Sequence, residues 1–354
     1  MSAPPEHDRF GRVGAVTLQE LSAGLLWPRV LRGFAMSLHP TRIVLGVLAV
    51  TMLILLSEAG DLLGLVERPE LAPQLPAMTL GVFVLGLPDA MLAMVLGAYE
   101  SFLNGPWAWL GIAVVALPAA SLFGCGIARS TAVDTAYDLQ LSVGESIGFA
   151  IRRWLSIVPA LLIPLVLVAV LVGVIQLTGL LLLQIEMLQW LGALIYGVWL
   201  LGALVLAVVW IVFLLGQPML MGAIGADGAD GADAVARTYA YLLNRPGRFL
   251  LYLLLGVVVA MLAFVLLSSL LEMTISGAEA LTGGDEDRGE GFAATAIDFW
   301  HLVARLLLWG WVVSYIYTTG TVIYMLMRRV CDEQDIREVW MPGMVGGTTT
   351  PERD

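Results

Sequence analysis

The residues best suited to chemistry gather in the stretch 222–257, where three aspartates follow one another among glycines. Asp227, Asp230 and Asp233 could together bind a cation. Calcium loops, however, place ligands at alternate residues and end on a bidentate glutamate, and this stretch has neither feature. We therefore favour a second interpretation, in which Asp230 is the N-cap of a short helix and Asp233 lies in its first turn.

The residues after the aspartates predict an elbow between two helices. Arg237 follows Asp233 by four positions, which favours an ion pair on one helical face. The helix is expected to end before Pro246, and an apolar run begins at Phe249. We interpret this as a helix lying on a membrane, a turn, and a helix crossing it. The cytoplasmic elbow motif comprises Asp227, Asp230, Asp233, Arg237, Tyr239, Arg245, Pro246 and Arg248.

A second polar group is expected near the other side of the membrane. Arg305 is the only basic residue inside a predicted span, where a charge costs roughly 2.5–3.5 kcal/mol. Asp298 and His301 share its helical face. Glu58 and Asp61 lie at comparable depth in the first span. A polar site at the outer ends of spans one and six is the sharpest functional hypothesis, and a structural ion pair closing the bundle is its alternative.

Motifs of known catalytic or metal sites are lacking. The sequence has no nucleophile elbow, phosphate-binding loop or HExxH pair, and His7 and His39 have no partners at metal-ligand spacing. We expect no catalytic residue, no metal and no cofactor. The prediction is therefore that this chain is not an enzyme.

Composition identifies the class of protein. Hydrophobic residues make up 59% and charged residues 13% of the 354 positions, which is too little polar surface to coat a soluble globule. Several apolar runs exceed the ~20 residues that cross ~30 Å of hydrocarbon. The net charge of −11 argues against nucleic acid as a partner. We expect an all-α polytopic membrane protein.

The chain divides into a single membrane domain, 17–340, between a flexible tail at 1–16 and a disordered tail at 341–354. Six spans are predicted, at about 43–64, 106–127, 155–180, 190–214, 249–271 and 299–327. Residues 79–103 are ambiguous, because Pro88 and Asp89 interrupt an apolar stretch. We favour a re-entrant or interfacial helix there, and a seventh span is the alternative.

Arginine distribution predicts the orientation, since basic residues are retained in the cytoplasm. Only Arg68 and Arg288 fall in the opposite loops, and an even number of spans places both termini in the cytoplasm. The arginines assigned to the cytoplasmic side are Arg9, Arg12, Arg29, Arg32, Arg42, Arg129, Arg152, Arg153, Arg237, Arg245, Arg248, Arg328, Arg329, Arg337 and Arg353.

The layout repeats three times: a cytoplasmic interfacial amphipathic helix, a span going out and a span returning. Ser142 and Glu145 predict a capping box at the start of the second interfacial helix. Two spans carry faces of small residues that favour close helix packing. These residues are Ala116, Ala120, Gly124 and Ala128 in span two, and Gly310, Ser314, Thr318 and Thr321 in span six.

Three segments carry a resemblance to known proteins: 124–136, 217–249 and 321–339. Their motifs include Gln-Pro-Met-Leu-Met-Gly-Ala-Ile, the spaced aspartates, Arg-Pro-Gly-Arg-Phe and Tyr-Met-Leu-Met-Arg-Arg. In these the chain resembles a group of uncharacterised bacterial six-span integral membrane proteins. More distantly, its layout is similar to the membrane domain attached to some glycerophosphodiester phosphodiesterases. The resemblance implies a bacterial inner membrane and no particular activity.

The first functional hypothesis is a non-enzymatic inner-membrane protein, acting as a scaffold or as an auxiliary subunit of a membrane assembly. The alternative is a transporter or lipid-handling protein that uses the outer polar group. The expected partners are other membrane subunits and the bilayer itself. Anionic headgroups attract each surface arginine by about 1 kcal/mol.

Overall fold

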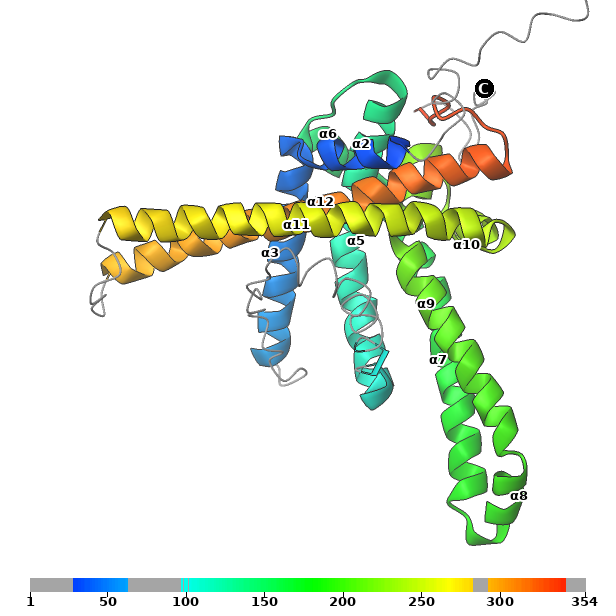
Figure 1. Cartoon of the computed structure of the whole chain (residues 1–354). Helices are drawn as coiled ribbons and strands as arrows, with labels where there is room; N and C mark the ends of the chain where they lie inside the picture. The colour runs from blue at the N-terminus through cyan, green and yellow to red at the C-terminus, as the bar shows by residue number, and fades with distance from the viewer. Residues whose placement is uncertain (1–27, 63–96, 98, 101, 283–291, 342–354) are drawn as a thin grey trace, which may run out of the picture.

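The computed structural model describes residues 28–62, 97, 99–100, 102–282 and 292–341, and the secondary structure of this part is helical (Figure 1). Six helices in it are long and apolar enough to cross a membrane, as predicted. These are α3 (Pro40–Leu62), α5 (Pro106–Tyr137), α7 (Trp154–Leu183), α9 (Tyr196–Asp227), α11 (Pro246–Thr282) and α12 (Phe292–Cys331). The protein is therefore an all-α polytopic membrane protein.

Three short helices each precede a long one: α2 (Pro28–Ser37), α6 (Val143–Arg152) and α10 (Gly231–Asn244). Each short helix is joined to the following long helix by a tight elbow. Between α6 and α7 the elbow consists of one residue, Arg153. Both predicted N-caps are present. The Ser142 hydroxyl accepts a hydrogen bond from the Glu145 N–H at 3.3 Å and the Glu145 carboxylate accepts one from the Ser142 N–H at 2.8 Å, which forms the capping box. The Asp230 carboxylate accepts a hydrogen bond from the Asp233 N–H at 2.8 Å.

The long helices pair as three hairpins, α3 with α5, α7 with α9, and α11 with α12. Helix α12 is central, because it packs against α2, α3, α5, α9 and α11. The hairpins diverge from this centre (Figure 1): α11 and α12 run across the direction of α3 and α5, and α7 and α9 extend to the same side as α3 and α5 but slant away from them. The turn of that last hairpin contains η1 (Glu186–Leu188) and α8 (Gln189–Leu194).

The predicted small-residue face of α12 forms the crossing with α3. A Cβ placed on Gly46 would lie 1.9 Å from the Gly310 carbonyl oxygen, so the two backbones touch. The elbow before α3 is held to the same face. The Ser314 hydroxyl donates to the Ser37 carbonyl at 2.8 Å, and the Trp311 Nε1–H donates to the Ser37 hydroxyl at 3.0 Å.

Helix α9 corrects the bounds of the predicted fourth span, 190–214. The helix begins at Tyr196 and continues through the glycines to Asp227, and the chain leaves it at Gly228, with a φ of +60°. Gly and Asp are poor helix formers in water. Close packing against α5 stabilises the helix at these residues, because a Cβ on Gly225 would lie 2.8 Å from the Arg129 backbone nitrogen on α5.

Other helices also extend beyond the predicted spans. Span two was expected to end at 127, but α5 runs to Tyr137, and α12 begins at Phe292 rather than 299. The tails 1–16 and 342–354 lie outside the described residues, as does most of 79–103. At the end of that ambiguous stretch Phe102 is buried, with its ring 5.4 Å from the Trp109 ring and 6.2 Å from the Trp210 ring.

Substitution of Gly225 by alanine is expected to destabilise the protein by about 1–3 kcal/mol, because the added methyl meets the backbone of α5. The matched control is Gly111→Ala, since a Cβ at Gly111 has nothing within 4 Å. Thermal unfolding of the detergent-solubilised chain would measure both. Equal midpoints for the two variants would contradict the close approach of α9 to α5.

Candidate functional site

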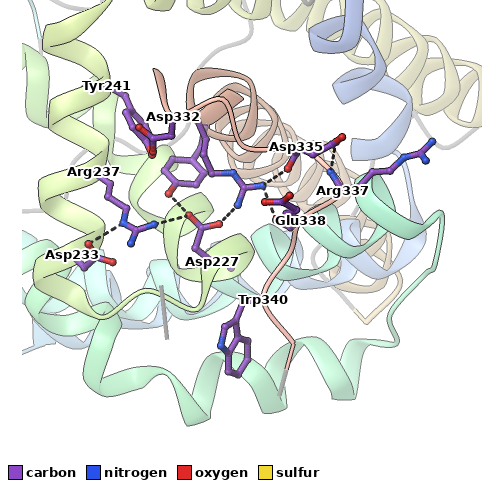
Figure 2. Close-up of polar contacts among 12 residues, drawn as sticks. Asp227, Asp233, Arg237, Tyr241, Asp332, Asp335, Arg337, Glu338 and Trp340 are labelled. Carbon is purple, nitrogen blue, oxygen red and sulfur yellow. Dashed lines mark hydrogen bonds and ion pairs between the residues drawn. The ribbon is translucent and has the colours of Figure 1, made fainter. Parts of the chain in front are cut away.

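A buried group of charges, here called the Asp227 cluster, joins the ends of α9, α10 and α12 (Figure 2). It comprises Asp227, Asp233, Arg237, Tyr324 and Arg328. Asp227 is the last residue of α9 and its side chain is 4% exposed. One carboxylate oxygen accepts a hydrogen bond from the Arg328 guanidinium, and the other accepts one from the Tyr324 hydroxyl at 2.5 Å. Tyr324 and Arg328 are four residues apart on α12, so one helical face presents both.

Helix α10 contributes the outer part of the cluster. Arg237 lies 3.5 Å from Asp227 and 2.9 Å from Asp233, the predicted partner four residues earlier. In Figure 2 its guanidinium lies between the two carboxylates. With Asp230 engaged as N-cap, each of the three aspartates has a structural contact. Within the described part of the chain, no group of three or more acidic, His or Cys side chains is arranged to bind a metal ion.

The segment after α12, residues 332–341, is not α-helical and closes this region. Arg328 donates to the carbonyl oxygens of Asp335 and Glu338 at 3.0 and 2.7 Å. The Trp340 N–H donates to the Ala226 carbonyl at 2.8 Å, so it binds a free carbonyl at the end of α9. The segment is therefore fastened to the cluster by its backbone, with Val339 buried beneath it.

A second buried arginine, Arg129 of α5, holds the same segment from the other side. Its guanidinium donates to the Gly225 carbonyl at 3.1 Å and to the Trp340 carbonyl at 2.8 Å. The Trp340 ring lies 4.4 Å from the Arg153 guanidinium, within the range of a cation–π interaction. The Phe149 ring of α6 lies 4.9 Å from Arg129.

The third buried arginine, Arg42 of α3, pairs with Asp134 of α5 at 2.6 Å and donates to the Ser130 carbonyl at 3.2 Å. Arg42, Arg129 and Arg328 were assigned to loops by the sequence, and the structure places all three inside helices, 0–5% exposed. The roles of Arg42, Arg328 and Tyr324 in buried polar contacts were missed. The available signal was an arginine within an apolar helical run, with Tyr324 one turn before Arg328.

The remaining elbow residues lie apart from the Asp227 cluster. Arg245 and Arg248 are exposed, and Pro246 is the first residue of α11, a position that suits proline. Tyr239 packs near Gly216 of α9, where burial raises the pKa of its hydroxyl. Helix α10 also contacts the C-terminal segment, because the Tyr241 hydroxyl hydrogen-bonds to the Asp332 carboxylate.

The predicted outer polar group is only partly described by the structure. Glu58, Asp298 and Arg305 are exposed, and within the described residues no ion pair joins Glu58 or Arg305 to another side chain. His301 instead lies 3.7 Å from Glu279 of α11, within its own hairpin. The side chain of Asp61 lies outside the described residues. Among the described residues, Glu58 on α3 therefore forms no ion pair with the members of the group on α12.

Fold and site together define a multi-pass helical membrane protein whose buried polar cluster fastens helix ends. No family model matches the sequence, and no curated protein or solved structure is significantly similar to it.

Replacing Asp227 with alanine is expected to destabilise the protein by about 3–5 kcal/mol, because Arg328 would keep its charge in a buried site without a counterion. The control is Asp233→Ala, which removes a partly exposed i, i+4 pair and should cost only about 0.3–0.5 kcal/mol. Unfolding in mixed detergent micelles would compare the two. If Asp233→Ala lowered the free energy of unfolding as much as Asp227→Ala, the buried ion pair would contribute no more to stability than the exposed one.

Proposed function

We propose that this protein is a non-enzymatic integral membrane protein of the bacterial inner membrane, acting as a scaffold or auxiliary subunit of a membrane assembly. The observation that carries the proposal is the uneven burial of its long helices. The most apolar part of α12 is 67% buried within the chain, but that of α9 and of α11 is only 17% buried. The outer helices therefore keep most of their apolar surface for lipid and for other membrane subunits.

The polar contacts support the same role. The aspartates and arginines that were candidates for chemistry at the elbow are engaged in capping, ion pairs and backbone hydrogen bonds. Such contacts hold helix ends at fixed positions. The resemblance to bacterial six-span proteins fits this proposal, in which α2, α6 and α10 lie along the cytoplasmic surface of the membrane.

Arg305→Leu tests the transporter alternative. A scaffold is expected to tolerate this change, because Arg305 is exposed and forms no ion pair among the described residues. Its unfolding midpoint and the mass of the complex extracted in mild detergent should match those of the wild type. A wild-type chain that extracts without stoichiometric partners would contradict the scaffold role. A solute or lipid flux in liposomes that Arg305→Leu abolishes would favour the transporter.

Orientation can be tested with the two native cysteines. Cys125 is buried and Cys331, at the end of α12, is partly exposed, so a membrane-impermeant maleimide should modify Cys331 alone. If the α12 end faces the cytoplasm, labelling is expected in inverted vesicles and not in intact cells. The control is Cys331→Ser, which should abolish the signal. Labelling of Cys331 in intact cells would reverse the proposed topology.

A further inference from the structure

A cleft of about 350 Å³ opens between α2, the last turn of α5, the last turns of α12 and the segment at 335–337. This volume lies at the lower end of the range for small-ligand pockets. Four arginines from three separate elements line it, and we call it the arginine cleft. They are Arg29 and Arg32 of α2, Arg329 of α12 and Arg337 of the C-terminal segment.

The positive charge of the arginine cleft is not neutralised by its acidic lining. Three aspartates also border the cleft: Asp134, Asp138 and Asp335. The Asp134 carboxylate is already bound by the buried Arg42, which lies outside the lining. The Asp335 carboxylate accepts a hydrogen bond from the backbone N–H of Arg337 at 3.0 Å. Within the described lining, the charges of Asp138 and Asp335 are therefore left to balance those of four guanidinium groups.

The arginines of the cleft also repel one another. Arg29, Arg32 and Arg329 form no ion pair or hydrogen bond with any residue in the described part of the chain. Burial lowers the pKa of Arg29, and the charges of Arg329 and Arg32 lower it further, against a smaller opposing effect of the Asp335 carboxylate. Guanidinium groups held this close, with fewer carboxylates than cations among the described residues, are unfavourable unless a further anion lies between them.

We propose that the arginine cleft binds a phosphate group, either the headgroup of an anionic phospholipid or a free phosphate. Guanidinium groups bind phosphate oxygens in a bidentate manner, and donors from three directions suit a tetrahedral anion better than a planar carboxylate. Arg29 and Arg32 are three residues apart, so α2 presents both on one face. The site does not depend on the scaffold role, since it uses none of the outward apolar surface.

The test uses the full-length chain in phosphatidylcholine nanodiscs, in two arms. In the lipid arm, native mass spectrometry counts retained phosphatidylglycerol when this lipid is added to the disc. In the phosphate arm, the unfolding midpoint is compared in inorganic phosphate and in chloride at equal ionic strength, because a ligand that binds only the folded chain raises the midpoint.

The cleft variant is Arg29→Gln/Arg32→Gln/Arg329→Gln. The matched control, Arg152→Gln/Arg245→Gln/Arg248→Gln, makes the same change of charge at three exposed arginines outside the cleft. The cleft variant is expected to lose roughly tenfold or more in affinity, and the control is expected to bind like the wild type. Without ligand, the cleft variant should be at least as stable as the wild type, since its substitutions remove repulsion.

If the cleft variant loses retained phosphatidylglycerol and the control variant does not, the ligand is a lipid headgroup. If the cleft variant loses the phosphate-induced shift of the unfolding midpoint and the control variant does not, the ligand is a free anion. Either result supports the site. Equal binding by all three chains, equal loss in the control, or no binding by the wild type in both arms would overturn it. If the glutamine variant does not fold, Arg29→Lys/Arg32→Lys/Arg329→Lys replaces it. That variant keeps the charge but loses bidentate contact, so weaker binding is again expected.

Discussion

The ion pair between Asp227 and Arg328 is the contact on which the arrangement of helix ends depends. Taking two charges out of water is costly, and such a pair is favourable only when the remaining donors and acceptors are also satisfied. Tyr324 and Arg237 contact the Asp227 carboxylate, and the carbonyls of Asp335 and Glu338 accept hydrogen bonds from the Arg328 guanidinium. Among the described residues the Arg328 Nε–H is left without an acceptor, so most but not all of these groups are satisfied. The charges are compensated only when α9, α10, α12 and the segment after α12 hold this arrangement. Any other arrangement would leave a buried charge without its partner.

Much of the fold was predictable because it follows from short-range rules. Apolar length gave the six spans, and local side-chain chemistry gave the caps at Ser142 and Asp230. The site was only partly predictable. Asp233 and Arg237 are neighbours on one helix, but Asp227 and Arg328 are 101 residues apart, and no periodicity indicates that they meet. For the same reason, an arginine close to a span end could not be identified as buried rather than bound to headgroups.

Glycine allows the polar contacts to form at short range. Backbones at Gly46 and Gly310, and at Gly225 and Arg129, approach so closely that a methyl group would displace one of them. Hydrogen bonds from side chains to main-chain carbonyls, such as Arg129 to Gly225, require this proximity. Beyond the crossings the hairpins diverge, so the chain is tightly packed where helix ends meet and open along the outer helices (Figure 1).

The order of the partners along the chain has a consequence for biogenesis. A ribosome makes Asp227 long before Arg328 and Trp340, so α9 is complete while its terminal carboxylate still lacks the Arg328 guanidinium and its Ala226 carbonyl lacks the Trp340 N–H. Until α12 emerges, that end must remain hydrated or be shielded by a chaperone. The contacts that hold the end of α9 therefore form late in synthesis, and chains stalled before α12 would lack them.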